Sequence, residues 1–426
     1  MISDALKHLP FAFKRITLFL SLFASSALAQ QLIEWERGPS RVDDLTFEVY
    51  VFGPGPSPEE WWGHIGLQVK DSRRKTELMY NWGMFTFDEK FMLNFVTGTL
   101  RFWVDAEPTP PSMAFYRRQG RHIESVTLNL STEQKIRLVA LISENMRPEN
   151  REYTYEYFRD NCSTRIRDLI DIVTEGSISK RAKSSTGVHT YRDHVNRVTY
   201  NNLGMNLLLS FLLGPIVDAP PTRWTDMFLP GELIRYLSQS EVPPGKQDAP
   251  LITGMRILEK GRIQENTKII KYFPWDLISG VVFGLTAWSL AILSVTLLPF
   301  ARSLLSVMNV SLALILGIPG TILLYFCTLT QHTYTYWNQN IIFANPITLA
   351  LAGVAIWSFT KNSNAARWNF RIHALFSALC AIAIIIKILP FSSQDNWVFI
   401  RFCFPAFILS TAAWWKICKT HREIKL

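Results

Sequence analysis

One cysteine stands apart among the residues that could do chemistry. The chain has five cysteines, and four of them fall in or beside long apolar segments near the C-terminus: Cys327, Cys380, Cys403 and Cys418. Cys162 therefore has no disulfide partner within its own region of the chain. In an oxidising compartment a solitary thiol is a liability unless it is buried or used, so Cys162 is a candidate nucleophile.

The sequence around Cys162 changes from a strand-like to a helical pattern. Apolar side chains recur at helical spacing after the cysteine: Ile166, Leu169, Ile170 and Val173. This pattern predicts a helix that begins at Cys162, with Asn161 as its N-cap. A thiol in the first turn meets unpaired backbone N–H groups and the positive end of the helix dipole, and Arg165 adds to that field. We therefore expect a lowered pKa for a Cys162 thiol that points inward.

A base for this thiol can come from an earlier segment. Apolar and other residues alternate from residue 64 to residue 69, which predicts a strand with His64 on the face opposite to the apolar side chains. Taken alone, His64 fits a core histidine and Cys162 fits a small buried hydrophobe. Taken together, they favour a nucleophile and its general base.

The first thirty residues predict export. Lys14 and Arg15 precede an apolar run over 16–28, and residues 27–29 have the Ala-Leu-Ala form of a signal-peptidase site. The mature chain would begin near Gln30, and the alternative is an uncleaved anchor helix. In either case the next segment lies outside the cytoplasm.

The last third of the chain predicts five membrane-spanning helices. Five apolar stretches lie at 275–299, 303–327, 342–360, 371–390 and 397–417, and each is near the ~20 residues that a spanning helix needs. Basic residues gather in the connections that would be cytoplasmic if the preceding domain is exported: Arg302, Lys361, Arg367, Arg371, Lys416, Lys419, Arg422 and Lys425. The outer connection 328–340 has no Lys or Arg. This asymmetry supports the orientation independently of the signal sequence.

Composition and charge agree with a membrane protein. The apolar fraction is 48%, with 14 Trp and 28 Phe, which is high for a soluble protein. The net charge of +9 is explained by cytoplasmic flanks that lie against anionic lipid. The sequence has no nucleic-acid-binding motif, no phosphate-binding glycine loop and no zinc-ligand spacing. We therefore expect no metal, cofactor or nucleic acid.

The exported region predicts an α+β domain. Strands are expected over 45–52 and 77–82, and the aromatic stretches 84–87 and 91–95 belong either to the core, which is the default, or to a lipid-facing patch. A capping-box pattern of Ser and Gln opens a helix over 131–146.

Two further segments connect this domain to the spans. The apolar stretch 203–217 is too short to span and predicts a buried or interfacial helix, and 239–264 resembles a polar linker. We divide the chain into a signal peptide or anchor, a thiol domain, interfacial helices with a linker, and a transmembrane domain: 1–29, 30–200, 201–270 and 271–426.

The order of these motifs resembles known thiol acyltransferases. A strand histidine followed by Asn-Cys at a helix start, here within 62–66 and 160–162, is similar to the circularly permuted papain-like enzymes. These include relatives of lecithin:retinol acyltransferase, whose thiol takes acyl chains from phospholipids. The fold that this resemblance implies is a permuted papain-like domain followed by an all-α bundle of about five helices.

A closer resemblance covers nearly the whole mature chain. It is to Lnb, the thiol-dependent lipoprotein N-acyltransferase family of Gram-negative bacteria, and the run Asp-Asn-Cys-Ser-Thr-Arg over 160–165 is its most specific motif. The other matching motifs are 80–85, Arg167-Asp168, 227–230, His332, Trp337-Asn338 and Asn345-Pro346. Trp82 departs from the pattern, since a Tyr is expected there.

The resemblance implies a reaction in two steps at the inner membrane, with the catalytic domain in the periplasm. Cys162, deprotonated by His64, would attack a phospholipid ester. The thioester would then pass its acyl group to the α-amine of a diacylglyceryl-cysteine lipoprotein. The alternatives are a membrane-bound thiol phospholipase or cysteine peptidase with the same pair, and a non-enzymatic binding module.

Further roles follow from the same resemblance. Backbone N–H groups at the start of the Cys162 helix could hold an oxyanion. Asn81 is the candidate to orient His64, with a plain strand or turn role as the alternative. Arg165 would bind a phospholipid phosphate or pair with Asp160 or Asp168, and His332 would contact a head group or support the site. Asn161, a cap and not a catalyst, is counted with these substrate-binding residues.

Overall fold

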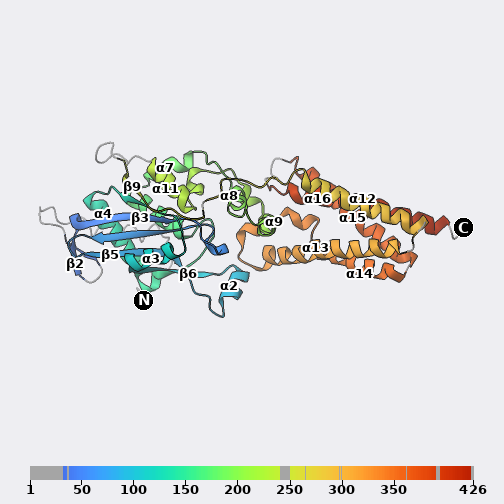
Figure 1. Cartoon of the computed structure of the whole chain (residues 1–426), viewed down its shortest axis with the longest axis horizontal. Coiled ribbons are helices and arrows are strands. Elements are labelled where there is room, and N and C mark those ends of the chain that lie inside the picture. Colours follow the sequence, from blue (N-terminus) through green and yellow to red (C-terminus); the bar gives the residue numbers. More distant parts are fainter. Residues whose placement is uncertain are drawn as a thin grey trace, which may run out of the picture.

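The computed structural model describes residues 32–35, 38–239, 250–263, 265–296, 298, 300–360, 362–389 and 394–423. The expected signal peptide or anchor lies outside the described residues. The molecule is elongated, with a sheet-containing domain at one end and a bundle of long helices at the other (Figure 1). An α+β domain followed by an all-α bundle is therefore confirmed.

An antiparallel sheet forms the centre of the first domain. Its seven strands in the described part of the chain follow the order β8-β6-β5-β4-β3-β7-β9. They are β3 (Leu45–Phe52), β4 (His64–Asp71), β5 (Thr76–Met84), β6 (Arg101–Pro108), β7 (Ile123–Leu128), β8 (Glu152–Thr154) and β9 (Ile252–Glu259). A separate ribbon pairs β1 (Leu32–Trp35) with β2 (Gly38–Arg41). The alternation of apolar residues places β3, β4 and β5 where the sequence predicts them.

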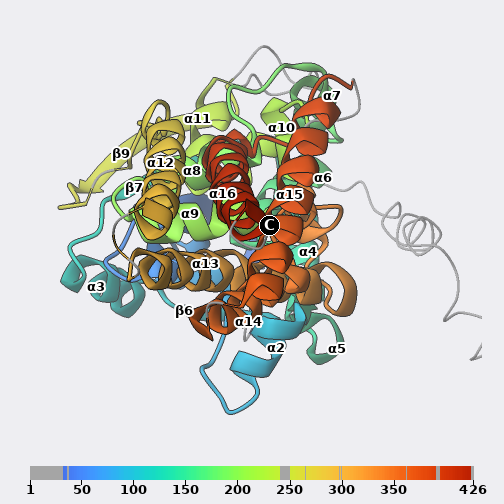
Figure 2. The same cartoon turned by 90° about the vertical axis from the view of Figure 1, so that its right-hand side faces the viewer.

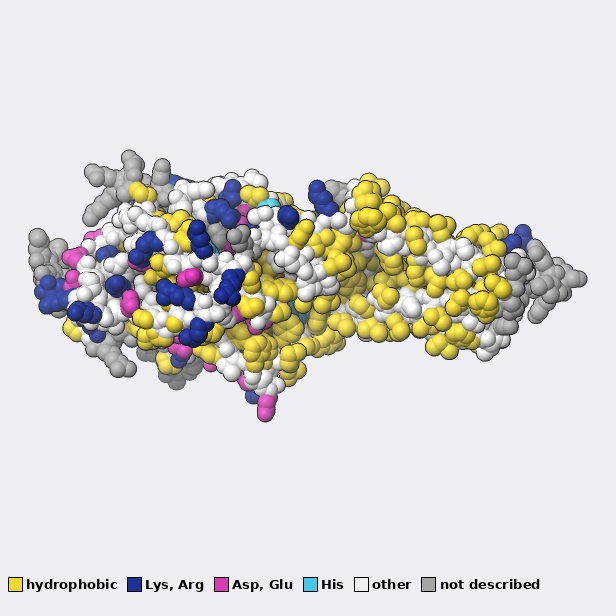
Figure 3. All heavy atoms as spheres, viewed as in Figure 1, with side chains coloured by type: hydrophobic (Ala, Val, Ile, Leu, Met, Phe, Trp, Pro, Cys, Tyr) yellow, Lys and Arg dark blue, Asp and Glu magenta, His cyan; other side chains and the backbone are white. Residues whose placement is uncertain are grey.

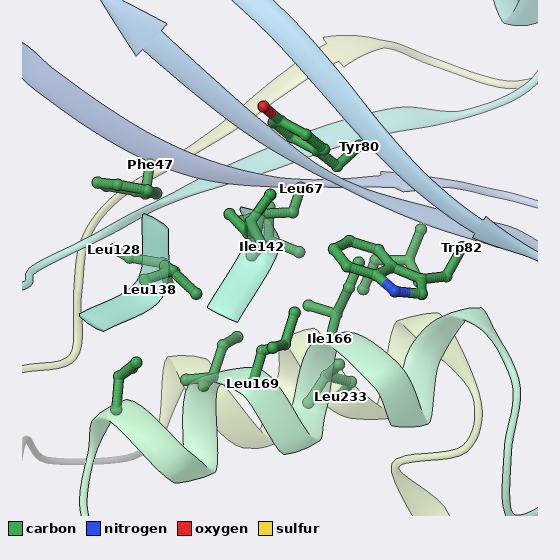
Figure 4. Close-up of a cluster of buried hydrophobic side chains, with 14 of the residues drawn as sticks. Phe47, Leu67, Tyr80, Trp82, Leu128, Leu138, Ile142, Ile166, Leu169 and Leu233 are labelled. Atoms are coloured by element: carbon green, nitrogen blue, oxygen red, sulfur yellow. The ribbon is translucent and has the colours of Figure 1, made fainter. Parts of the chain in front are cut away.

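Helices cover both faces of this sheet. One face packs against α4 (Thr132–Met146), α6 (Cys162–Val173) and α11 (Pro230–Ser238), and the core between these layers holds Trp82, Ile166 and Leu233 (Figure 4). The opposite face carries a smaller cluster with α3 (Thr109–Arg118). Shorter helices complete the domain: α5 (Pro148–Arg151), α7 (Ser177–Ser184), α8 (Tyr191–Val198) and α10 (Arg223–Asp226).

The segment expected as a linker contributes to the sheet. Within 239–264, residues 240–249 and 264 are not described, but β9 pairs antiparallel with β7 at the sheet edge. Met255 and Ile257 of β9 stay exposed. An edge strand with polar neighbours has weak alternation, so its pattern cannot be separated from that of a linker.

The helix bundle has five apolar segments of spanning length among the described residues. They are α12 (Trp275–Thr296), α13 (Ala301–Leu329), the segment Gln339–Thr360, α15 (Ser363–Ile386) and α16 (Trp397–Glu423). Viewed end-on, α16 lies between α12 and α15 (Figure 2). The expected number of spans is therefore confirmed.

Two spans differ from expectation in detail. α15 begins at Ser363, so Arg367 and Arg371 lie in its first turns and not in the preceding connection. Long basic side chains at a helix end can reach the interface, which permits this earlier start. The third span is a series of 3-10 turns followed by α14 (Ala350–Trp357), because Pro346 opens a new turn that Asn345 caps.

The two ends of the molecule are joined through α9 (Leu203–Leu212), the short apolar helix expected in this region. The side chains of Asn338 and Asn340, beyond α13, donate to the carbonyl oxygen of Phe211 at 2.9 and 2.8 Å. From the other side, the Arg192 guanidinium of α8 donates to the carbonyl oxygen of Ser210 at 2.9 Å. Last-turn carbonyls have no partner within their own helix, so these side chains cap α9 and tie the bundle to the domain.

The aromatic stretches that follow β5 are only partly in the core. Phe85 and Phe91 pack against the core cluster. Other apolar side chains of this region are exposed, on or just before α2 (Phe91–Thr97): Phe87, Met92, Leu93 and Phe95. The default assignment to the core is therefore wrong for these four residues. An aromatic run shows that water is avoided, but not whether protein or lipid replaces the water.

Candidate active site

Cys162 is the first residue of α6, and a dense cap fixes its position. The Asn161 side-chain oxygen accepts a hydrogen bond from the Thr164 backbone N–H at 2.9 Å. The Asn161 amide group donates to the carbonyl oxygens of Tyr157 and Phe228 at 2.9 and 3.0 Å. The N-cap expected at Asn161 is confirmed, and these contacts direct its amide into the protein.

Backbone N–H groups surround the Cys162 sulfur. The N–H groups of Cys162 and Ser163 interact with it, because the first turn of α6 has no earlier helical carbonyl for them to bond. The N–H of Ile65, the residue after His64 on β4, also donates to the sulfur. Three backbone N–H groups therefore lie beside the sulfur, near the position that the carbonyl oxygen of an attacked ester would take.

A bulge in β5 lies against Cys162. The β4–β5 ladder runs from Asp71 to Leu67, and β5 then bulges between Trp82 and Met84. Gly83 lies in this bulge with φ of +90°, a conformation that favours glycine. A Cβ on Gly83 would lie 3.6 Å from the Cβ of Cys162. The bulge therefore brings the chain of β5 directly against the cysteine.

His64 begins β4 and is held by a line of polar side chains across the sheet. Its Nε2 lies 3.1 Å from Asn81 Oδ1 on β5, and Asn81 Nδ2 donates to Glu107 Oε1 on β6 at 2.9 Å. A carboxylate only accepts hydrogen bonds, so Glu107 fixes the amide and turns its oxygen to the imidazole. His64 Nε2 must then be the donor. Nδ1 is left as the basic nitrogen.

Burial governs the protonation of the pair. Both residues keep partial solvent exposure, although dense surrounding protein desolvates them. Desolvation raises the pKa of the Cys162 thiol to about 11, against the backbone N–H groups that act to lower it. The expected lowering of this pKa is therefore wrong, because desolvation outweighs the field of the helix N-terminus.

The pKa of His64 shifts in the direction that keeps the imidazole neutral. Desolvation lowers the pKa of His64 to about 4, while the hydrogen bond to Asn81 acts in the opposite direction. At neutral pH the site therefore holds a thiol and an uncharged imidazole. A proton must leave the sulfur during the attack itself, and an imidazole with a free Nδ1 suits that task.

Arg121 and Tyr116 border the pair, and neither was singled out from the sequence. Arg121 is buried, donates from Nε to the Gly53 carbonyl oxygen at 2.7 Å, and lies 5.0 Å from the centre of the Tyr116 ring. The Tyr116 ring stacks 6.0 Å from that of His64. The positive charge of Arg121 acts to lower the pKa of His64 and of the thiol. No motif or spacing marks Arg121, Tyr116 or Glu107, since only the folded sheet brings them to this site.

Two expected substrate-binding residues have protein partners. Arg165 Nη2 donates to Asp160 Oδ2 at 2.7 Å, and its guanidinium lies 4.0 Å from the centre of the Tyr153 ring. His332 follows α13, and its Nε2 lies 2.8 Å from the carbonyl oxygen of Phe95 on α2. These contacts position both side chains, and their binding of a phosphate or head group stays a prediction.

Comparison with known protein families decides the assignment. Residues 31–197 match the Lnb N-terminal periplasmic domain, and residues 271–417 match the Lnb transmembrane domain. The chain belongs to the Lnb family. No curated protein and no solved structure matches it.

Membership agrees with the architecture at both ends of the chain. The Lnb periplasmic match contains His64, Asn81 and Cys162, and the transmembrane match contains the five apolar segments of the described chain. The protein is a membrane protein with a periplasmic domain, and the family suggests an enzyme that modifies lipoproteins.

Proposed function

We propose that this protein is a lipoprotein N-acyltransferase of the inner membrane. The proposal is supported by the position of Cys162 at the start of α6, beside Ile65 of β4, and by His64, the preceding residue of that strand, whose imidazole is bonded to Asn81. A thiol, a base and three backbone N–H donors are the parts that acyl transfer through a thioester needs.

The first half-reaction takes the acyl group from a phospholipid. The Cys162 sulfur attacks the ester carbonyl carbon while His64 Nδ1 accepts the thiol proton. The backbone N–H groups of Ile65, Cys162 and Ser163 hold the oxyanion. The C–O bond then breaks, the imidazolium returns its proton to the leaving alcohol, and a lysophospholipid departs from the thioester.

The second half-reaction delivers the acyl group to an amine. The uncharged α-amine of a diacylglyceryl-cysteine lipoprotein attacks the thioester carbonyl carbon. His64 takes a proton from the attacking nitrogen and returns it to the sulfur as the C–S bond breaks. An amide and the free Cys162 thiol result, so no water and no cofactor is consumed.

Desolvation and location favour transfer over hydrolysis. Surrounding protein desolvates both Cys162 and His64 and dominates the pKa of each, which disfavours attack by water on a thioester at this position. The segment just before Cys162 contacts the bundle, because the ring of Phe158 lies 4.7 Å from that of Tyr334 beyond α13. A thioester formed here lies close to the membrane surface, where both lipid substrates reside.

The proposal is tested by mass spectrometry of a lipoprotein N-terminus. Wild type or Cys162→Ala would be expressed in a strain that lacks its own N-acyltransferase. We expect an added acyl mass on the lipoprotein with the wild type and none with the variant. If the wild type is present in the membrane and the amine stays free, lipoprotein acylation is wrong. Lysophospholipid and free fatty acid without an acylated lipoprotein would then indicate a phospholipase.

A further inference from the structure

The segment between β5 and β6 exposes apolar side chains that nothing in the described protein covers. Phe87 is 69% exposed, Met92 and Leu93 are each 64% exposed, and Phe95 is 41% exposed. All four lie within one short segment, on or just before α2. Scattered apolar residues on a surface are ordinary, but a contiguous group of this kind marks a contact with another apolar phase.

The C-terminal end of α2 is docked at the outer end of α13. The Gln331 backbone N–H donates to the Thr97 carbonyl oxygen at 2.8 Å, and His332 Nε2 lies 2.8 Å from the Phe95 carbonyl oxygen. Gly98 permits this approach, because a Cβ there would lie 2.9 Å from the backbone of Gln331. The helix is therefore held at the level where α13 leaves the apolar zone.

The exposed face of α2 continues the lipid-facing surface of the bundle. Near its outer end, α13 exposes Ile322, Tyr325 and Leu329, and Leu329 is 72% exposed. Apolar side chains extend over the bundle surface and onto the adjoining part of the periplasmic domain (Figure 3). In the end-on view, α2 projects beyond the outline of the bundle (Figure 2), and the side view places it at the end of α13 nearest to the sheet (Figure 1).

A series of aromatic rings connects this exposed segment to the catalytic thiol. The Phe87 ring lies 5.0 Å from that of Phe85, Phe85 lies 4.9 Å from Phe102, and Phe102 lies 4.2 Å from Tyr155. Phe102 also lies beside the Gly83 bulge that contacts Cys162. The thiol and the exposed tip therefore lie at the two ends of one series of packed rings, of which Phe102 is buried in the core.

We propose that residues 85–97 insert into the membrane face on the periplasmic side and guide a phospholipid acyl chain along these rings to Cys162. The occupant of the exposed α2 face is the lipid bilayer. The donor is thus a phospholipid that stays in its leaflet while its ester reaches the thiol. The membrane contact of α2 stands by itself, and the delivery of the donor rests on the proposed acyl transfer.

Photocrosslinking tests the membrane contact without any catalysis. A benzoylphenylalanine would replace Leu93 in full-length Cys162→Ala protein, reconstituted in vesicles of phosphatidylethanolamine and phosphatidylglycerol. The matched control carries the same probe at Ile257, which is 59% exposed on β9, at the far edge of the sheet. We expect a phospholipid adduct at position 93 and none at position 257. No adduct at position 93, or equal adducts at both positions, would overturn the membrane contact.

Kinetics test the delivery of the donor. Leu93→Glu should lower acyl transfer from vesicle phospholipid by about tenfold or more, because a charged side chain disfavours entry into an apolar phase. Ile257→Glu should leave the rate unchanged, and both variants should acylate Cys162 normally from a short, water-soluble thioester in detergent. An unchanged vesicle rate in Leu93→Glu, or an equal loss with the soluble thioester, would overturn the delivery. The wild type could transfer nothing to a lipoprotein and still form the Cys162 thioester from vesicle lipid. Thioester formation is then the readout for donor delivery, so failure of lipoprotein acylation and failure of donor delivery are distinguished.

Discussion

His64 and His194 both lie in the periplasmic domain, but the protein holds their rings in opposite ways. For His194 both ring nitrogens are engaged, since Nε2 lies 3.2 Å from Asp226 Oδ1 and Nδ1 lies 3.2 Å from Arg197 Nη1. His64 is bonded through Nε2 to Asn81, and within the described residues no hydrogen bond reaches its Nδ1. An imidazole with both nitrogens hydrogen-bonded joins helices together, whereas an imidazole with one free nitrogen can accept a proton.

The partners of the two rings differ in charge as well. His194 lies in a network of ionisable groups in which Arg197 also pairs with Glu232 at 3.3 Å. The amide of Asn81 is uncharged, so it orients His64 while favouring the protonated ring less than a carboxylate would. The comparison indicates that buried polar groups at His194 stabilise the contacts of α8, α10 and α11, and that those at His64 leave one ring nitrogen available, as the proposed base requires.

Removal of either member of the catalytic pair should have the largest effect. Cys162→Ala and His64→Ala should each lower acyl transfer on the order of 10⁴-fold, and the double variant should be no slower, because the two groups act as a unit. The rate of acyl transfer from phospholipid to a lipoprotein, followed by mass spectrometry, is the measurement. His122→Ala, at a partly exposed histidine of the same domain, is the control. A rate in His64→Ala within tenfold of the wild type would remove the imidazole from the mechanism.

At His194 we expect a loss of stability without a loss of activity. Asp226→Ala leaves buried His194 Nε2 and the Val188 backbone N–H without their carboxylate partner, which should destabilise the domain by about 3 kcal/mol. The midpoint of thermal unfolding should fall, and the rate per folded molecule should not change. Asp43→Ala, at an exposed carboxylate, should alter neither quantity. A normal midpoint with lost activity would contradict the structural role and make the His194 network part of the chemistry.

Loss of the orienting amide should have an intermediate effect. Asn81→Ala should lower kcat by about 10- to 100-fold with little change in KM, since the base remains but its ring is no longer held. Single-turnover acylation of Cys162 would separate this step from lipid binding. An effect on KM alone would place Asn81 in substrate binding.

The pH profile should show the smallest effect under physiological conditions. Because the pKa of His64 is lowered to about 4, the rate of Cys162 acylation by the phospholipid should stay level from pH 8 down to about pH 5.5 and fall as the pH drops through about 4, where the base becomes protonated. Asn81→Asp should move this acid limb to higher pH, because a carboxylate beside the ring favours its charged form. An acid limb of the wild type near pH 6.5 would show that His64 is not desolvated.

The sequence was sufficient for those features that depend on local pattern. The length of the apolar stretches predicted the spans, because a bilayer sets the length of a helix that crosses it. The spacing after Cys162 predicted α6 and its cap at Asn161. The alternation from residue 64 predicted β4, and with it the position of His64 at the start of a strand. Each of these features is decided within one helix or one strand.

Features that depend on the surroundings of a residue in the folded protein could not be predicted from the local sequence pattern. The pKa of the Cys162 thiol rises because the packed domain excludes water, which is a property of the whole fold and not of the helix start. β9 was taken for part of a linker because its strand pairing is visible only beside β7. The aromatic stretches were assigned to the core, since no pattern distinguishes a side chain that faces protein from one that faces lipid.

The sequence by itself therefore determined the elements on which the candidate residues lie, with Cys162 at the start of a helix and His64 at the start of a strand. Only the tertiary structure placed Glu107 behind Asn81, Arg121 near Cys162 and His64, and α2 beside the end of α13. The physical reason is the distance along the chain between the residues that interact. A helix or strand follows from side chains a few positions apart, whereas a desolvated site follows from segments that are distant in the chain and meet only when the sheet has formed.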